Sequence, residues 1–314
     1  MPTTTAAAIG AAQRRVAGPS LARRIEANPF TWLVPVAVML GVFYLYPILD
    51  VFRLGLTNAS LVGSDERYTL VTLRAMFENP ALLDILKTTF VFTIASVIGQ
   101  QVFGLAIALI VMRGERRKLR GMVALRTIVL IAWVIPGIAN GLIWQMLFSE
   151  APFGAINSVL RMMHISPVAW LSDPNIAMLS AVISNVWRGT AFSMIVFYAA
   201  LKAIDPTLYE AASVDGAGHL QKLRFITLPQ LRAAILVNSI LVTIQTLNTF
   251  DAIISLTGGG PGRATEVLSL FTFNTVFRNY DLAGGSVLSV LMLVISLVLA
   301  LFYASFMPRR EASE

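Results

Sequence analysis

The residues best suited to chemistry lie in one polar stretch, from Asp205 to Arg232, which separates two long apolar segments. Two acidic side chains, Glu210 and Asp215, lie among small residues, which are mostly alanine and glycine, between 211 and 218. Carboxylates suit a basic partner surface, and small residues let another chain approach closely. This combination predicts an element that contacts another protein, and not a covalent catalyst.

The first half of this stretch carries the start and stop signals of a short helix. Asp205 is a good N-cap, and Pro206 fits the first helical position, where a missing N–H costs nothing. Gly216 and Gly218 are ready C-terminal breakers. The sequence therefore predicts a helix that begins at Pro206 and ends before these glycines.

The second half predicts another short helix, over about 219–228, followed by the next apolar segment at Pro229. Its apolar residues are expected on one stripe: Leu220, Leu223 and Ile226. Together the two helices form a helix–turn–helix over 205–232, which we call the elbow. We expect it on the membrane surface, with its two acidic side chains on the exterior.

Three segments of the elbow resemble the EAA signature of permease subunits of bacterial ABC importers: Glu210-Ala211-Ala212, Asp215-Gly216-Ala217 and Phe225-Ile226-Thr227-Leu228-Pro229. The resemblance implies a coupling helix that sits in a cleft of a partner ATPase and transmits the closure of that ATPase to the membrane. The residues that it implies for this coupling are Glu210, Ala211, Ala212, Asp215, Gly216, Ala217 and Pro229.

The composition is that of an integral membrane protein: 56% of the 314 residues are hydrophobic and only 13% are charged. The absence of cysteine excludes disulfides, thiol catalysis and Cys-ligated metals. The two histidines, His164 and His219, are far apart and argue against a histidine metal site. In such a protein a net charge of +7 reports topology and not nucleic-acid binding.

We expect an all-α fold with a transmembrane domain over 29–307 and six spans, at about 30–51, 88–112, 123–148, 175–201, 233–256 and 284–306. Most of the 24 basic residues fall in the N-terminal tail (1–28), the run after the second span, the loop 202–232 that contains the elbow and the C-terminal tail (308–314). The positive-inside rule therefore places both termini and the elbow in the cytoplasm.

Between the spans we expect external segments. One, over 52–86, holds a short helix and the Asn79-Pro80 turn, and another, over 149–174, ends in the helix start signal Asp173-Pro174. A third is amphipathic and runs to Asp281. Within the third span, Pro136-Gly137 predicts a bend that faces protein or a water-filled cavity.

No ATP-binding or catalytic signature is present. The glycine turn at 257–262 has no following Lys-Ser/Thr, so it is not a phosphate loop. No Ser/His/Asp or paired-carboxylate arrangement is favoured by spacing. We therefore expect that this chain is not an enzyme and binds no cofactor, and that ATP and Mg are held by partner ATPase subunits.

The same turn, with Phe250-Asp251 before it, resembles the end of the fifth span in carbohydrate-uptake permeases of the maltose-type branch. The resemblance implies a loop that lies against a solute-binding protein, through Gly258, Gly259, Gly260 and Pro261. A plain glycine turn is the alternative interpretation.

Substrate contacts require polar side chains at membrane depth, where polar groups facing lipid are expensive. In the fifth span the candidates are Gln245, Thr246, Asn248 and Thr249. Asn238, Gln245 and Asn248 or Thr249 recur at spacings of seven and then three or four, which places them on one face. Amides donate and accept hydrogen bonds, which suits sugar hydroxyls. The alternative is hydrogen bonding between helices, which we favour for Asn238.

Weaker substrate-path candidates are Asn140, Trp144 and Gln145 after the predicted bend. Trp144 either stacks on a sugar ring or packs between helices. Arg188 falls near the middle of the fourth span, where a buried charge indicates function. It would bind an anionic substrate such as a sugar phosphate, or pair with a carboxylate such as Asp251.

The sequence thus predicts a permease subunit in a bacterial inner membrane that imports a sugar or polyol. The resemblance implies three kinds of partner: a second homologous permease that completes a heterodimer, two ATP-binding subunits and an external solute-binding protein. Alternatives within the class import sn-glycerol 3-phosphate, sulfate or amino acids. A secondary transporter or channel would need an intramembrane carboxylate relay or a pore-lining ring, and neither stands out.

Overall fold

The computed structural model describes residues 29–63 and 65–307, so the predicted tails, 1–28 and 308–314, lie outside the described residues. The chain divides into two units, residues 1–50 and 51–314. Within the described residues the β contacts amount to one isolated bridge, Thr57–Tyr68, and the elements are helices. The prediction of an all-α fold is confirmed.

The described part of the first unit, residues 29–50, is one continuous helical run. It contains α2 (Pro29–Leu40), the π-helical turn η1 (Gly41–Leu45) and the start of α3 (Tyr46–Leu54). From Trp32 to Leu49 it carries no charged residue, and almost all of its side chains from Trp32 to Asp50 are exposed. A long helix with exposed apolar side chains has the surface that lipid favours.

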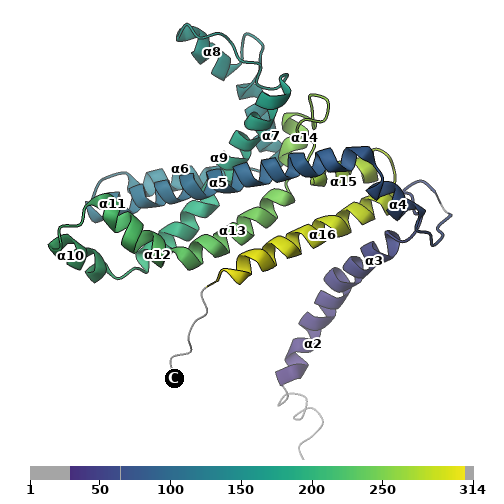
Figure 1. The fold of residues 1–314 in the computed structure, drawn as a ribbon, viewed down its shortest axis with the longest axis horizontal. Helices are drawn as coiled ribbons and strands as arrows, with labels where there is room; N and C mark the ends of the chain where they lie inside the picture. The colour runs from purple at the N-terminus through teal and green to yellow at the C-terminus, as the bar shows by residue number, and fades with distance from the viewer. Residues whose placement is uncertain (1–28, 64, 308–314) are drawn as a thin grey trace, which may run out of the picture. The chain divides into compact units, whose positions relative to one another are not determined.

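The second unit holds the remaining helices (Figure 1). Outside the elbow they are α4 (Val71–Phe77), α5 (Pro80–Arg116), α6 (Met122–Val134), α7 (Gly137–Leu147), α8 (Ala155–Met162), α9 (Pro174–Lys202), α13 (Arg232–Leu247), α14 (Asp251–Leu256), α15 (Leu268–Phe277) and α16 (Leu282–Ser305). The elbow contains α10 (Pro206–Val214), α11 (His219–Lys222), η2 (Leu223–Thr227) and α12 (Leu228–Gln230).

The helix α5 runs from beside α4 to beside the elbow (Figure 1). It starts eight residues before the predicted span because the side chain of Asn79 accepts a hydrogen bond from the amide of Ala81 (3.0 Å) and Pro80 takes the first helical position. Residues 80–86, predicted as loop, are therefore helical.

Helices α5 and α9 form the closest pair in this unit, and α6 and α13 pack against α9 as well. The contact is tight at Gly104 of α5, where an added Cβ would lie 2.5 Å from the Cβ of Ser193 on α9. Small residues at such points let two helix backbones approach closely, which is how helices associate in membranes.

The bend predicted at Pro136-Gly137 is confirmed and is sharper than a kink. Helices α6 and α7 meet at 105°. The cause is local: Ile135 and Pro136 adopt extended backbone angles, and proline has no N–H to continue the helical ladder.

The fifth predicted segment, 233–256, is not one helix, and this correction has a local cause. α13 ends at Leu247 and α14 starts at Asp251. The amide of Asn248 donates to the carbonyl of Ile244 (2.8 Å), and the hydroxyl of Thr249 donates to that of Gln245 (2.9 Å). Side chains that bind nearby backbone groups in this way compete with the helix.

The segment that runs to Asp281 was predicted to be amphipathic, and its burial corrects this, whereas its external position stays a prediction. α15 packs against α16 and α5, and the four residues from Leu268 to Phe271 are all buried. Four consecutive buried residues leave this turn without a polar outer face, so its apolar and hydroxyl side chains belong to the packed interior.

The predicted external loop at 149–174 also contains a short helix, α8. The indole N–H of Trp170 donates to the side chain of Asn157 on that helix (3.1 Å). The predicted start signal at Asp173 is confirmed, because its carboxylate accepts hydrogen bonds from the amides of Asn175 (2.9 Å) and Ile176 (3.1 Å) at the start of α9.

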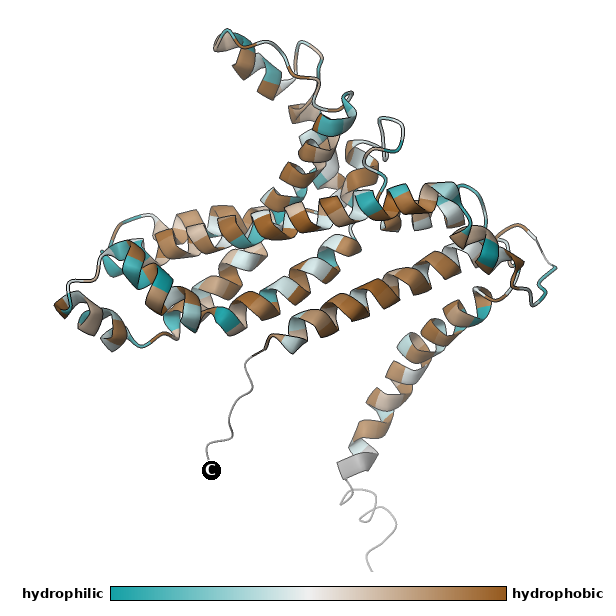
Figure 2. Ribbon diagram, viewed as in Figure 1, coloured by the Kyte–Doolittle hydropathy of each residue, from teal (hydrophilic) through white to brown (hydrophobic). Residues whose placement is uncertain are grey.

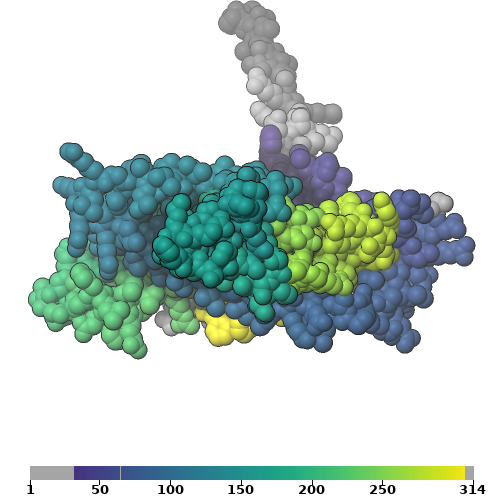
Figure 3. All heavy atoms as spheres, turned by 90° about the horizontal axis from the view of Figure 1, so that it is seen from above, coloured from purple at the N-terminus to yellow at the C-terminus, as the bar shows by residue number. Residues whose placement is uncertain are grey.

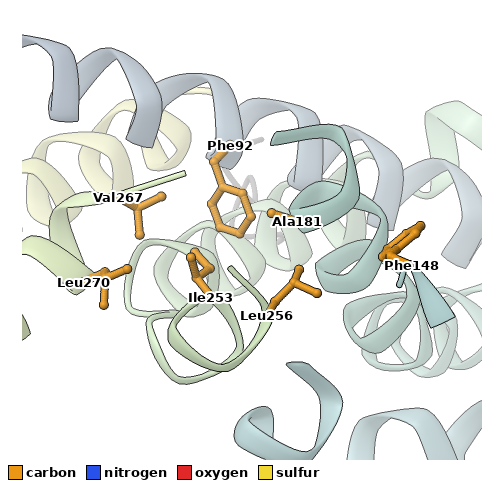
Figure 4. Packing of buried hydrophobic residues seen from close by; sticks show 7 residues of the cluster. All are labelled: Phe92, Phe148, Ala181, Ile253, Leu256, Val267 and Leu270. Atoms are coloured by element: carbon orange, nitrogen blue, oxygen red, sulfur yellow. The ribbon is translucent and has the colours of Figure 1, made fainter. Parts of the chain in front are cut away.

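The main core lies where α5, α9, α14 and the start of α15 meet (Figure 4). Its buried side chains are Phe92, Phe148, Ala181, Ile253, Leu256, Val267 and Leu270. Figure 2 shows α16 apolar along most of its length, whereas the elbow carries hydrophilic residues. By length and composition three described helices are able to cross a membrane, and up to six if each of three bent pairs counts as one span.

Candidate functional site

The first half of the elbow is the predicted capped helix. The amide of Thr207 donates to the carboxylate of Asp205 (2.9 Å), and hydrogen bonds from the backbone and side chain of Thr207 hold the pKa of Asp205 below its usual value. α10 ends at Val214, and Gly216 follows with φ of +75°. This backbone conformation favours glycine, so the predicted stop is confirmed.

The second half is helical from His219 to Gln230, but it is interrupted by the π-helical turn η2. A π turn inserts an extra residue into the helical repeat, so residues spaced for an ordinary helix leave their common face. Leu220 is accordingly 76% exposed, whereas Leu223 and Ile226 are half-buried. The predicted single stripe of these three residues is wrong.

Side-chain hydrogen bonds lock the two halves together. The hydroxyl of Tyr209 lies 3.0 Å from that of Thr227, which in turn donates to the carbonyl of Lys222 (3.2 Å). The ammonium of Lys222 donates to the hydroxyl of Ser213 (2.6 Å), and this hydroxyl donates to the carbonyl of Tyr209 (2.7 Å). The elbow is therefore a compact body whose halves move together.

The outer surface of the elbow carries the predicted acidic side chains, Glu210 and Asp215, both exposed. Neither forms an ion pair with another described residue. Large apolar side chains stand beside them in the open: Val214 (89% exposed), Leu220 and Phe225. Unpaired carboxylates among exposed apolar groups have the chemistry of a protein-docking surface.

The elbow is anchored to the ends of two long helices. The guanidinium of Arg116, the last residue of α5, lies 5.2 Å from the centre of the Tyr209 ring. Beside it, the hydroxyl of Tyr198 on α9 donates to the carboxylate of Glu115 (2.5 Å), and Lys202 pairs with the same carboxylate (3.2 Å). The elbow's movements are thus tied to those of α5 and α9.

Glu115, Tyr198 and Lys202 form a cluster, which we call the Glu115 cluster. The sequence analysis did not predict it, although one signal in the sequence pointed to it. Glu115 is the single acidic residue in the basic run 113–120. Arg126 of α6 also approaches its carboxylate (3.7 Å), so the cluster joins three helices at the level of the elbow.

Two of the substrate-path candidates face the middle of α9. The amide of Asn140 on α7 is buried and donates to the hydroxyl of Ser184 (2.8 Å). The amide of Asn185 donates to the hydroxyl of Thr246 on α13 (3.5 Å). These contacts bring polar groups of three helices together.

Asn238, Gln245 and Asn248 were predicted to share one face of the helix, but they do not share one environment. Asn238 is buried and donates to the side chains of Gln101 on α5 (2.8 Å) and Ser193 on α9 (3.0 Å), which is the expected bonding between helices. Gln245 and Asn248 are exposed, so they alone of the three are open to another molecule. Thr249 is buried beside them.

Trp144 is held by other rings. It lies 5.1 Å from Phe148 and 5.9 Å from Trp187, between ring centres, which is a packing arrangement. Its indole nitrogen is buried without a hydrogen-bond partner among the described residues. Gln145 beside it is exposed and donates to the carbonyl of Leu256 (3.4 Å).

Arg188 lies half-buried near the middle of α9, and its Nε is buried with no hydrogen-bond partner among the residues described. No ion pair joins it to Asp251, so that predicted alternative is wrong. Asp251 instead accepts a hydrogen bond from the amide of Ala252 (2.9 Å) and packs against Gly137, where an added Cβ would meet its carboxylate at 1.8 Å.

The glycine turn is not helical, as predicted, and it is folded onto the chain that follows it. Thr265 donates from its hydroxyl to the carbonyl of Gly260 (2.9 Å) and from its amide to that of Gly259 (3.1 Å). Glu266 then pairs with Arg263 (2.6 Å) and accepts from the amide of Asn274 on α15 (2.9 Å). The turn is thereby held in place, with Gly258 exposed, Gly259 buried and Gly260 and Pro261 half-buried.

The comparisons with known proteins agree with this architecture. Residues 100–312 match the family described as Binding-protein-dependent transport system inner membrane component. The chain is 35% identical to the trehalose/maltose transport system permease protein MalF of Thermococcus litoralis over 277 residues, 87% of this chain and 91% of the relative. It is 32% identical to the sulfoquinovosyl glycerol transport system permease protein SmoG of Agrobacterium fabrum over 287 residues, 89% and 90% of the two chains.

A solved structure shares the fold. It is that of a bacterial alginate ABC transporter in complex with an alginate pentasaccharide-bound periplasmic protein, with a TM-score of 0.73, 23% identity and coverage of 90% of this chain and 94% of that one. The matching family is one of transporter subunits and not of enzymes. The chain therefore belongs to the binding-protein-dependent transport system inner membrane components, the ABC importer permeases that its elbow motif resembles.

Proposed function

We propose that this chain is the permease subunit of an ATP-driven importer that carries a sugar or a related polyol across a bacterial inner membrane. The observation that carries the proposal is the elbow: a locked helix–turn–helix with two unpaired exposed carboxylates, fixed to the ends of α5 and α9. Relatives named for trehalose, maltose and sulfoquinovosyl glycerol support the class of substrate.

In this proposal the elbow docks on the cytoplasmic side against an ATP-binding subunit. Glu210 and Asp215 meet basic side chains there, while Ala211, Ala212 and Ala217 allow close approach. Closure of two such subunits, which hold ATP and Mg, moves the elbow and with it the ends of α5 and α9. The spans then re-orient around a site at the middle of the membrane, in alternating access.

The remaining partners follow from the same cycle. A second, homologous permease completes a heterodimer, and both termini of this chain lie in the cytoplasm. An external solute-binding protein rests against the glycine turn, through Gly258, Gly260 and Pro261, while the buried Gly259 shapes the turn. The solved relative that holds a periplasmic protein supports such a partner. Gln245, Asn248, Thr246 and Asn140 then belong to the substrate path.

The test is ATP-dependent uptake of labelled sugars into proteoliposomes that hold the co-purified complex and its binding protein. We expect accumulation of one sugar, lost on Glu210→Lys and retained on Asp65→Lys, an equal charge reversal at an exposed site outside the elbow. Normal uptake by a stably inserted Glu210→Lys protein would contradict the coupling role. Transport by this chain alone, indifferent to ATP, would indicate a channel or secondary carrier.

An acidic sugar derivative, or sn-glycerol 3-phosphate, is a second candidate substrate, favoured by one observation. The Nε of Arg188 is buried without a partner among the described residues, and an anion would supply one. The uptake panel therefore includes neutral disaccharides and sulfonated or phosphorylated solutes. Loss of uptake of an anionic solute on Arg188→Gln, with partial recovery on Arg188→Lys, supports this candidate. If the complex instead carries a neutral sugar, and both variants take it up at the wild-type rate, Arg188 has no role in substrate binding.

A further inference from the structure

A cavity of about 770 Å³ separates the elbow from the end of α5. The inner sides of α10 and α11 form one wall, and the last turns of α5 with the chain that leads to α6 form the other. Figure 3 shows the elbow, in green, at one end of the second unit beside the blue-teal atoms of the end of α5 and the start of α6. Of its lining residues only Glu210 has a proposed functional role above, in docking against the ATP-binding subunit, and no role is assigned there to the cavity itself.

The charge of the lining is unbalanced. Four basic side chains line it, and Glu210 is the single carboxylate among the lining residues: Arg113, Arg116, Arg117 and Lys222 are the basic ones. Within the described chain none of these five groups forms an ion pair. A concave surface with this excess of positive charge attracts and holds anions.

Two of the basic groups are already held in place. The guanidinium of Arg116 lies over the ring of Tyr209, and the ammonium of Lys222 donates to Ser213. Both contacts leave the charge of the side chain uncompensated and retain N–H groups for an anion. A phosphate oxygen bound there would form charge-assisted hydrogen bonds, which are the strong kind.

Much of the remaining lining is apolar, although Ser213, His219 and Thr227 also contribute polar groups. The position of the apolar part identifies the source of the anion. Leu109, Ile110 and Met112 belong to the last apolar turns of α5, and Arg113 follows them directly. The cavity therefore spans the level at which the apolar helix gives way to charge. A free phosphate would use only the basic part, whereas a phospholipid uses both, with its headgroup on the basic residues and an acyl chain on the apolar ones.

We propose that this cavity binds the phosphate headgroup of an anionic phospholipid. Arg113, Arg116, Arg117 and Lys222 hold the phosphate, and the apolar turns of α5 receive the start of an acyl chain. Because Arg116 also contacts Tyr209, the bound lipid links the membrane surface to the position of the elbow.

The experiment counts lipids retained by the purified transport complex in native mass spectrometry, after equilibration with mixed phosphatidylglycerol and phosphatidylcholine. Each basic side chain near an anionic lipid contributes about a fivefold gain in affinity, so the double variant Arg116→Gln/Arg117→Gln is expected to bind phosphatidylglycerol roughly 30-fold more weakly. The matched control is Lys118→Gln/Arg120→Gln, which removes two charges from the same run but from residues outside the cavity lining. It is expected to retain phosphatidylglycerol normally.

A second variant guards against misfolding, since Arg116 also supports the elbow. Arg113→Gln/Arg117→Gln leaves the contact with Tyr209 intact and is expected to show the same loss. Equal losses in the cavity and control variants would overturn the proposal, because that result reports only general surface charge. Retention of phosphatidylglycerol by all variants would overturn it as well.

Two further arms separate the sources of the anion. Inorganic phosphate at millimolar concentration is added to the complex, and displacement of phosphatidylglycerol with the same sensitivity to the cavity variants would indicate a small-anion site and not a lipid site. Loss of the ATP-binding subunits from Arg113→Gln/Arg117→Gln, with an unchanged lipid count, would show that a protein surface fills the cavity.

Discussion

Replacement of Gly216 by alanine tests the turn of the elbow with a single methyl group. Gly216 has φ of +75°, and no atom lies within 4 Å of an added Cβ, so the change alters backbone strain and nothing else nearby. An L-residue in this conformation costs about 1–2 kcal/mol. Replacing glycine also lowers the conformational entropy of the open chain, which favours the closed turn by about 0.4–1 kcal/mol. The net destabilisation of the closed turn is about 1 kcal/mol, or about fivefold in its opening equilibrium.

The assay is hydrogen exchange of the amide of Ala217 in the purified complex. This amide donates to the carbonyl of Ala212 across the turn (2.8 Å), so its exchange reports opening of the turn. We expect about fivefold faster exchange in Gly216→Ala, and an intermediate rate in Gly216→Asn, because asparagine tolerates the left-handed region better than alanine.

Gly218→Ala is the matched control. It adds the same methyl group in the same turn, but Gly218 has φ of −70°, and the nearest atom to an added Cβ is 3.6 Å away, an ordinary contact. Exchange at Ala217 should stay within about twofold of the wild type, because alanine adopts this backbone conformation without strain. The preference for glycine over alanine at an N-cap acts on the start of α11 and not on the bond of Ala217. Equal acceleration by Gly216→Ala and Gly218→Ala, or none by the first, would refute the account of the turn.

Three further predictions follow from contacts described above. Tyr209→Phe removes the hydrogen bond to Thr227 between the halves of the elbow but keeps the ring under the guanidinium of Arg116. Amide hydrogen exchange across the elbow should therefore rise by about fivefold (about 1 kcal/mol), and clearly more in Tyr209→Ala. Gly104→Ala forces a Cβ to 2.5 Å from that of Ser193 and should lower the unfolding free energy by about 1–3 kcal/mol in thermal denaturation of the detergent-solubilised complex, whereas Gly55→Ala, with its nearest neighbour at 3.5 Å, should change it little. The hydroxyl of Ser172, followed by the backbone amides of Leu171 and Ser172, lowers the pKa of Glu150. This carboxylate therefore stabilises the loop at 171–172, just before α9, above its usual pKa of 4.5, and the contribution is lost as the pH falls through the lower folded pKa. Hydrogen-exchange protection of these two amides should fall in that acid range, and a Glu150→Gln protein that shows the same acid step would contradict this account.

Local signals predicted much of the fold correctly because their causes lie within a few residues. The caps at Asp173 and Asp205 and the break at Pro136 depend on side chains and backbone angles of the immediate neighbours. The break after Leu247 was missed for a related reason. Asn248 and Thr249 were interpreted as substrate contacts, and their bonds to the preceding carbonyls end the helix there.

The site depends on contacts between distant segments, which no spacing rule contains. Asn238 and Gln245 lie seven residues apart, yet one is buried against α5 and α9 and the other is exposed, because burial depends on where the neighbouring helices pass. The Glu115 cluster and the contact of Arg116 with Tyr209 likewise join residues that only the fold brings together. The elbow's acidic surface was predictable because it needs no distant partner within the chain.

The length of α5 has a mechanical consequence. Its 37 residues extend about 55 Å, well beyond the roughly 30 Å of a bilayer's hydrocarbon core, and no described break interrupts it. A stiff rod of that length, pivoting near its centre, moves both of its ends in opposite directions by about 2–3 Å for every 5° of tilt. One end is the Asn79 cap and the other is the arginine that touches Tyr209. Small displacements at one end of α5 therefore reach the other end in full, without any change in the shape of the helix.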